Sequence, residues 1–126
     1  MAGRIQITAG SIVMAGELKD TPTARAIRDA LPIRAIARTW GEEIYFPIPV
    51  DESLDETARE VVERGDIGYW PTGKAFCIFF GPTPMSRGAE IRPASAVNVV
   101  GKVLGDPGDF KVVRDGDAVE LEIEEE

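Results

Sequence analysis

Short runs of apolar residues, each bounded by turn-forming residues, are the feature of this sequence that most restricts its fold. Ile5 and Ile7 alternate with polar neighbours, and a second run over 11–15 follows directly after Gly10, which is the pattern of a β-hairpin. Comparable runs recur about every 8 to 12 residues along the chain. The sequence therefore predicts many short strands, in the arrangement of a closed antiparallel barrel.

The remaining strands follow from the same pattern. We expect them at 33–38, 44–46, 66–70, 74–80, 94–104 and 118–123, with a turn at 71–73. Gly101 should break the strand in which it lies, and the inward-facing residues of the last strand should be Val119, Leu121 and Ile123. Residues 51–64 are ambiguous: a loop with at most one helical turn is the preferred interpretation, and a short helix or a strand through Val61 and Val62 are the alternatives.

Two short helices are expected between the strands. Thr21 has the properties of an N-cap, Pro22 suits the first helical position, and Pro32 is a stop, so this segment predicts a helix of about three turns. Its apolar residues on one face are Ala24, Ile27 and Leu31, and they should cover one end of the barrel. A helical turn should run from Asp106 through Phe110.

Composition limits the number of domains and the kinds of partner. A chain of 126 residues with 44% hydrophobic content suits one compact domain over 1–126. The net charge of −8 argues against nucleic acid or an anionic membrane as partner, because both attract clustered Lys and Arg. No apolar stretch resembles a signal peptide or a membrane span. The single cysteine, Cys77, cannot form an internal disulfide, and with these features it favours a cytoplasmic location.

The residue types also limit the chemistry. The chain has no histidine, which excludes histidine-based triads and metal sites, and we expect no metal and no cofactor. Glu42 and Glu43 are adjacent and should point to opposite faces of a strand. One glutamate, such as Glu42, beside Trp40 and Tyr45 could bind a cationic group or have a raised pKa if buried; the alternative is a solvated or arginine-paired carboxylate.

Aromatic residues are concentrated in the middle of the chain. Eight of the nine lie between residues 40 and 80, and alternate positions on a strand cannot all face a barrel interior. The pattern therefore predicts an apolar binding groove formed by Trp40, Tyr45, Tyr69 and Trp70, although each residue could instead belong to the core. Further candidate binding residues are Phe76, and Thr83 and Met85 in a rim loop. The alternative for Phe76 is that it fills one face with Ile78 while Cys77 and Phe79 pack under a helix.

Several of these segments resemble a known family. "TPTARAIRDALP" at 21–32, "VNVVGKVLGD" at 97–106 and the ending "VVRDGDAVELEIEEE" resemble cyclophilins, the peptidyl-prolyl isomerase fold. The sequence is more similar still to a small bacterial and archaeal family called cyclophilin-like, through "TWGEEIYF" at 39–46, "GDIGYWPTGKAFCIFFGPTPMS" at 65–86 and "PASAVNVVGK" at 93–102. The resemblance covers nearly the whole chain. It implies a mainly β fold, a closed eight-stranded antiparallel cyclophilin-like β-barrel with two short helices.

The resemblance implies only part of the residues that isomerase chemistry needs. It places Arg34 at the position of the catalytic arginine, whereas the alternative is a surface strand residue. The family's substrate-binding glutamine, and the Trp and His beside its proline pocket, have no counterpart. The preferred hypothesis is therefore a binding module for a peptide or small ligand. The alternatives are a divergent peptidyl-prolyl isomerase using Arg34 and a small-molecule enzyme with a glutamate base; the exposed aromatic residues could also form a homodimer interface.

Overall fold

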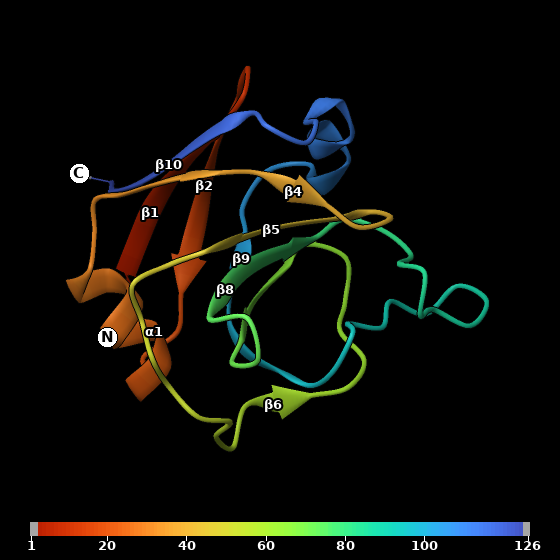
Figure 1. Ribbon diagram of the computed structural model, residues 1–126. Helices are drawn as coiled ribbons and strands as arrows, with labels where there is room; N and C mark the ends of the chain where they lie inside the picture. The colour runs from red at the N-terminus through yellow and green to blue at the C-terminus, as the bar shows by residue number, and fades with distance from the viewer. Residues whose placement is uncertain (1–2, 125–126) are drawn as a thin grey trace.

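The computed structural model describes residues 3–124 as a β-barrel with two short helices (Figure 1). The strands are β1 (Gly3–Ala9), β2 (Ile12–Leu18), β3 (Ile33–Ile36), β4 (Arg38–Thr39), β5 (Glu43–Pro47), β6 (Ala58–Arg59), β7 (Asp66–Trp70), β8 (Ala75–Phe79), β9 (Val97–Val103) and β10 (Ala118–Ile123). The helices are α1 (Pro22–Asp29) and the 3-10 helix η1 (Pro107–Val112). The predicted mainly β fold is confirmed.

The barrel closes through one extended segment that belongs to both ends of the sheet. The strand order is β3-β10-β1-β2-β9-β7-β8-β5-β4, and β6 pairs with β9 outside this path. β3 and β4 are consecutive and are separated only by Ala37, whose N–H donates to Asp117 O while its carbonyl accepts from Gly116 N–H. Since β3 pairs with β10 and β4 with β5, all antiparallel, the sheet returns on itself. Nine strands lie on the path, or the expected eight if β3 and β4 are taken as one.

Helix α1 begins as its sequence predicts. Thr21 Oγ1 accepts a hydrogen bond from Ala24 N–H at 3.2 Å, and Pro22 occupies the first helical position, where a missing N–H has no effect. Ala24 and Ile27 are buried in the barrel core. The helix has 8 residues, about two turns rather than the expected three.

The apolar residues form two clusters on opposite faces of the sheet. The larger one fills the barrel and includes Phe46, Tyr69, Phe76, Phe80 and Phe110. The second comprises Val62, Ala75, Cys77, Phe79, Ile91, Val97 and Val99, with Tyr45 and Trp70 packed against it. The expectation that Cys77 and Phe79 pack under a helix is wrong. Their cluster includes no residue of α1 or η1. It includes instead Ile91 of the β8–β9 connection (teal in Figure 1), which forms a β-bridge with Val62.

Three further expectations can be compared with the structure. Ile123 is 46% exposed and does not belong to the core, although Val119 and Leu121, on the same face of the strand, are buried. β9 continues through Gly101 without a break, because a glycine there lets β9 approach β2: an added Cβ would lie 2.1 Å from Glu17 O. Residues 51–64 form a loop without a helix, as preferred, in which the two-residue β6 and the single bridge from Val62 to Ile91 are the only β pairings. Among residues 3–124, no helix is long and apolar enough to cross a membrane.

Candidate functional site

A largely apolar pocket of about 180 Å³ lies beside the second cluster. Its lining residues are Trp40, Glu43, Tyr45, Trp70, Pro93, Ala94 and Val97. Trp40, Tyr45 and Trp70 are each half-buried, so part of every ring is covered by protein and part faces the pocket or solvent. Three of the four aromatic residues that the sequence places in a groove are therefore together.

Strand β5 aims Glu43 and Tyr45 at this pocket. Side chains alternate along a strand, so Glu43 and Tyr45 share one face while Ile44 and Phe46 enter the barrel core. Trp40 reaches the same side through a tight turn, in which its N–H donates to Glu43 O at 2.9 Å. The turn requires Gly41, which has φ +59° and would meet Thr83 and Pro84 if it carried a Cβ.

Trp70 is fixed from two sides. Its Nε1–H donates a hydrogen bond of 2.6 Å to Ser95 Oγ, which satisfies the polar edge of the indole. The ring also lies over Gly73, where an added Cβ would come within 2.7 Å of Trp70 ring carbons. The orientation of this pocket wall is thus set by the β7–β8 turn and by the segment that precedes β9.

Glu43 is the acidic residue among those that line the pocket. It is only 6% exposed, and its Oε1 has no hydrogen-bond partner among the described residues. Burial raises the pKa of Glu43 to about 7, while a hydrogen bond with the Cys77 thiol acts in the opposite direction. The carboxyl group is therefore close to half ionised at neutral pH, in contrast to an ordinary surface glutamate.

Cys77 lies behind Glu43 and is itself buried. Burial raises the pKa of the Cys77 thiol well above its usual value, and the charge of Glu43 and their hydrogen bond act in the same direction. A neutral, buried thiol is a poor nucleophile and metal ligand. Within residues 3–124, no group of three or more His, Cys, Asp or Glu side chains is placed to hold a metal ion.

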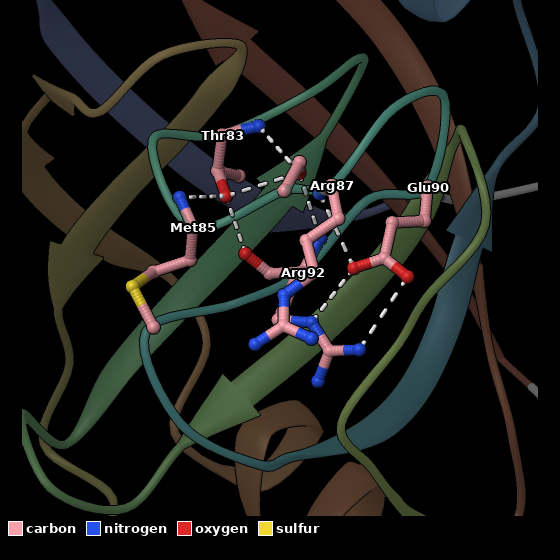
Figure 2. Close-up of polar contacts among 6 residues, drawn as sticks. Thr83, Met85, Arg87, Glu90 and Arg92 are labelled. Atoms are coloured by element: carbon pink, nitrogen blue, oxygen red, sulfur yellow. Dashed lines mark hydrogen bonds and ion pairs between the residues drawn. The ribbon is translucent and has the colours of Figure 1, made fainter.

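The β8–β9 connection carries Pro93 and Ala94 to the pocket, and a polar network holds it in shape (Figure 2). Thr83 Oγ1 donates to Arg92 O, and Ser86 Oγ accepts from the N–H groups of Thr83 and Arg92 at 2.9 and 3.1 Å. Figure 2 also shows Arg92 beside Glu90, with which it forms an ion pair of 2.7 Å.

Thr83 and Met85, both candidate binding residues from the sequence, do not line the pocket. Thr83 is buried within the network just described, and the Met85 side chain extends from the same loop into solvent (Figure 2). Thr83 therefore acts on the pocket only by shaping the segment that borders it.

Tyr69 and Phe76 lie in the barrel core rather than in the groove that the sequence predicts. Tyr69 is fully buried, its hydroxyl donates to Val50 O at 2.6 Å, and it accepts from Glu52 N–H. The reason is the alternation of β7, which places Trp70 on the outer face and its neighbour Tyr69 on the inner one. Phe76 stacks on Phe46 inside the barrel, with ring centres 5.2 Å apart.

Glu42, the glutamate named from the sequence, points away from the pocket. Its carboxylate lies 3.6 Å from Lys111 Nζ and borders a different depression, next to Phe80 and Gly81. Its neighbour Glu43 takes the position beside the aromatic rings. The spacing of two residues between Glu43 and Tyr45 on one strand indicates that Glu43, and not Glu42, shares a face with Tyr45. Pro93, Ala94 and Val97 were also missed, and no local pattern marks them as pocket residues.

Arg34 does not line the aromatic pocket. It lines a different depression, together with Ile36, Ala118 and Glu120. Its side chain is 85% exposed, and its Nε donates to Glu120 Oε2 at 2.7 Å. The structure thus does not bring the proposed catalytic arginine together with the proposed binding residues.

Comparison with known proteins finds both a family and a solved structure that are similar to this chain. A family model described as Cyclophilin-like matches residues 3–122. Among solved structures, the solution structure of the hypothetical protein AF2241 from Archaeoglobus fulgidus is similar, with a TM-score of 0.82 and 45% sequence identity, over 97% of this chain and 95% of that chain. No curated protein matches at the significance we required.

Proposed function

The chain belongs to the cyclophilin-like family, and we propose that it is a binding module that takes a small ligand, or one side chain of a peptide, in the pocket of Trp40, Tyr45 and Trp70. The observation that carries this proposal is the gathering of three half-buried aromatic rings around a concave surface. Aromatic side chains offer large contact areas with little flexibility, and concave, mostly apolar pockets with few polar groups are typical of ligand sites.

The size of the pocket restricts the ligand. Its volume of about 180 Å³ is below the roughly 300–1,000 Å³ of pockets that enclose drug-sized molecules. A compact group, such as a single ring or a branched alkyl head, is therefore the part of the ligand that we expect to enter it.

Intrinsic fluorescence offers a direct test, because the two tryptophans of the chain, Trp40 and Trp70, both line the pocket. A set of small neutral, cationic and anionic fragments should include members that change the emission in a saturable way. Ala94→Leu, which narrows the pocket from an exposed position, should weaken their binding about tenfold or more.

Ala89→Leu is the matched control, since Ala89 is also exposed on the β8–β9 connection but borders a different depression. It should leave the titrations unchanged. Absence of any saturable response across the set, or equal effects of the two leucine variants, would contradict the proposal.

A divergent isomerase using Arg34 is a separate hypothesis with its own test. The Arg34 guanidinium forms an ion pair with Glu120 and borders a depression that has no aromatic residue in its lining. This arrangement gives the isomerase hypothesis little support. Catalysed isomerisation of proline-containing tetrapeptides that is lost in Arg34→Ala and retained in Ala94→Leu would establish that hypothesis and displace ours.

Glutamate-base chemistry has one observation in its favour, which concerns Glu43 rather than Glu42. The pKa of Glu43, about 7, is in the range in which a general base is most effective at neutral pH. Turnover of a bound fragment whose rate rises with pH through this value, and which is abolished in Glu43→Gln, would identify an enzyme.

A further inference from the structure

We propose that the ligand group of this pocket is an alkylammonium cation, bound by the Glu43 carboxylate between the rings of Trp40, Tyr45 and Trp70. This inference rests on the proposed function and names the chemical class of its ligand.

The first argument is the unpartnered carboxyl oxygen. Buried polar atoms in proteins nearly always have a hydrogen-bond partner, and a buried carboxylate without one is costly. Glu43 is 6% exposed, its Oε1 has no partner among the described residues, and it lines the pocket. A ligand that brings a positive charge into the pocket would compensate the buried carboxylate, and an ammonium group with an N–H would in addition donate a hydrogen bond to it.

The second argument is the absence of a protein cation at the site. The pocket-lining residues include neither Lys nor Arg, and the described neighbours that affect the pKa of Glu43 include no positive charge. The titratable groups on the strands around Glu43 are Cys77 of β8, Tyr45 of its own strand and Arg38 of β4, which is paired with Tyr45. Burial keeps the Cys77 thiol neutral, and Arg38 lies near Asp115 and does not line the pocket. An anionic ligand would meet an uncompensated carboxylate, whereas a cation would neutralise it.

The third argument is the wall of aromatic rings. The face of an aromatic ring is electronegative and attracts quaternary or substituted ammonium groups, most strongly when the group is removed from water. Two indoles and one phenol around a single acid combine this attraction with a full negative charge. The net charge of −8 on the chain favours the approach of cations as well.

The proposal predicts a direction of pH dependence that distinguishes it from binding of a neutral ligand. Only ionised Glu43 attracts a cation, and with a pKa of about 7 the ionised fraction rises about tenfold between pH 6 and pH 8. The affinity for a permanently charged ligand should rise by the same factor. A neutral ligand that accepts a hydrogen bond from protonated Glu43 should instead bind more weakly as the pH rises.

Choline and its uncharged isostere 3,3-dimethylbutan-1-ol are suitable probes, because they differ in charge but hardly in shape. Tryptophan fluorescence and calorimetry on the whole chain at pH 6 and pH 8 should show choline binding at least about tenfold more tightly than the alcohol at pH 8. A peptide containing trimethyl-lysine, compared with free choline, tells whether the alkylammonium group comes from a small molecule or from a protein side chain.

Glu43→Gln keeps the shape of the side chain and removes its charge. It should reduce the preference for choline to the part that the aromatic rings supply and remove its pH dependence, while binding of the alcohol persists. Glu42→Gln is the matched control, since Glu42 is adjacent in sequence, faces another depression, and should leave both probes unaffected.

Three outcomes are decisive against the proposal, and they are distinguishable. Equal binding of the two probes, or choline binding that weakens as the pH rises, overturns the cation assignment but leaves the pocket as a ligand site. A choline preference of undiminished size in Glu43→Gln places the charge recognition elsewhere and also overturns it. No binding of either probe, together with no response in the fragment set, overturns the inference and the proposed function alike.

Discussion

Glu43 and Cys77 lie diagonally across the β5–β8 ladder, in which Glu43 is paired with Phe79 and Tyr45 with Cys77. Both groups are buried, and the pKa of each is raised chiefly by that burial. In the folded protein, the thiol is neutral and the carboxyl group is neutral below about pH 7. This pair makes the outer face of the sheet sensitive to pH in a way that surface charges are not.

The stability of the protein should fall as the pH rises through the range set by Glu43. The folded protein keeps the Glu43 proton up to about pH 7, whereas the unfolded chain releases it near 4.5, so unfolding releases a proton between these values. The stabilisation is fully present below pH 4.5 and is lost as the pH passes 7, with a total of about 3 kcal/mol.

Urea unfolding of wild type and Glu43→Gln at pH 5 and pH 8 would measure this effect. From pH 5 to pH 8, the free energy of unfolding of Glu43→Gln should rise relative to that of wild type by about 2 to 3 kcal/mol. Other carboxyl groups titrate equally in both proteins and cancel from the comparison. If the difference between the two proteins is the same at both pH values, the Glu43 carboxyl is not titrating as described.

Cys77 should be inert in the folded protein. It is buried and its pKa is raised, so the reactive thiolate is both scarce and inaccessible. A chromogenic disulfide reagent at pH 8 should label it only at the rate of unfolding, and fully in denaturant. Rapid stoichiometric labelling without denaturant would show that the β5–β8 region opens readily.

Asn98→Ala should destabilise the protein by about 2 to 4 kcal/mol. Asn98 is fully buried; its Nδ2 donates to Thr23 Oγ1 and to Ser53 O, and its Oδ1 accepts from Asp55 N–H at 2.9 Å. The side chain thus joins β9 to α1 and to the 51–57 loop, and its removal leaves several polar groups without a partner. Ser53→Ala is the control, because only the carbonyl of Ser53 accepts the bond from Asn98; a loss of equal size there would contradict the assignment.

Gly101→Ala should destabilise the barrel by about 3 kcal/mol or more, since the added methyl group would overlap Glu17 O and force β9 away from β2. Gly88→Ala provides the comparison. Gly88 has φ +66° and no atom within 4 Å of its added Cβ, so only backbone strain of about 1 to 2 kcal/mol is expected. Thermal unfolding of both variants would rank them, and a milder effect at Gly101 would mean that β9 and β2 separate easily.

Local patterns were sufficient to predict most elements of the fold. The hairpin of β1 and β2, the N-cap at Thr21 and the turn at 71–73 each depend on residues close together in sequence, and the structure has all three. Gly101 was misjudged because its role depends on β2, which lies far away in the chain. Ile123 was misjudged because alternation does not indicate that the end of a strand extends beyond the core.

The candidate site was harder to predict, because a period of two does not say which face of a strand is the core. All five residues of β8 are buried, with the barrel core on one side and the second cluster on the other. Both faces of β5 and β7 therefore carry apolar residues, and the pattern could not separate Tyr69 from Trp70 or Glu42 from Glu43. The contribution of Pro93 and Ala94 depends on how the β8–β9 connection folds back.

The position of β10 between β1 and β3 has a consequence for synthesis on the ribosome. Residues 118–123 emerge after every other strand, and until then β1 has one open edge and β3 has no partner strand. Open strand edges are templates for pairing with other chains. The nascent protein is therefore open to misassociation until β10 emerges and closes the barrel between β1 and β3.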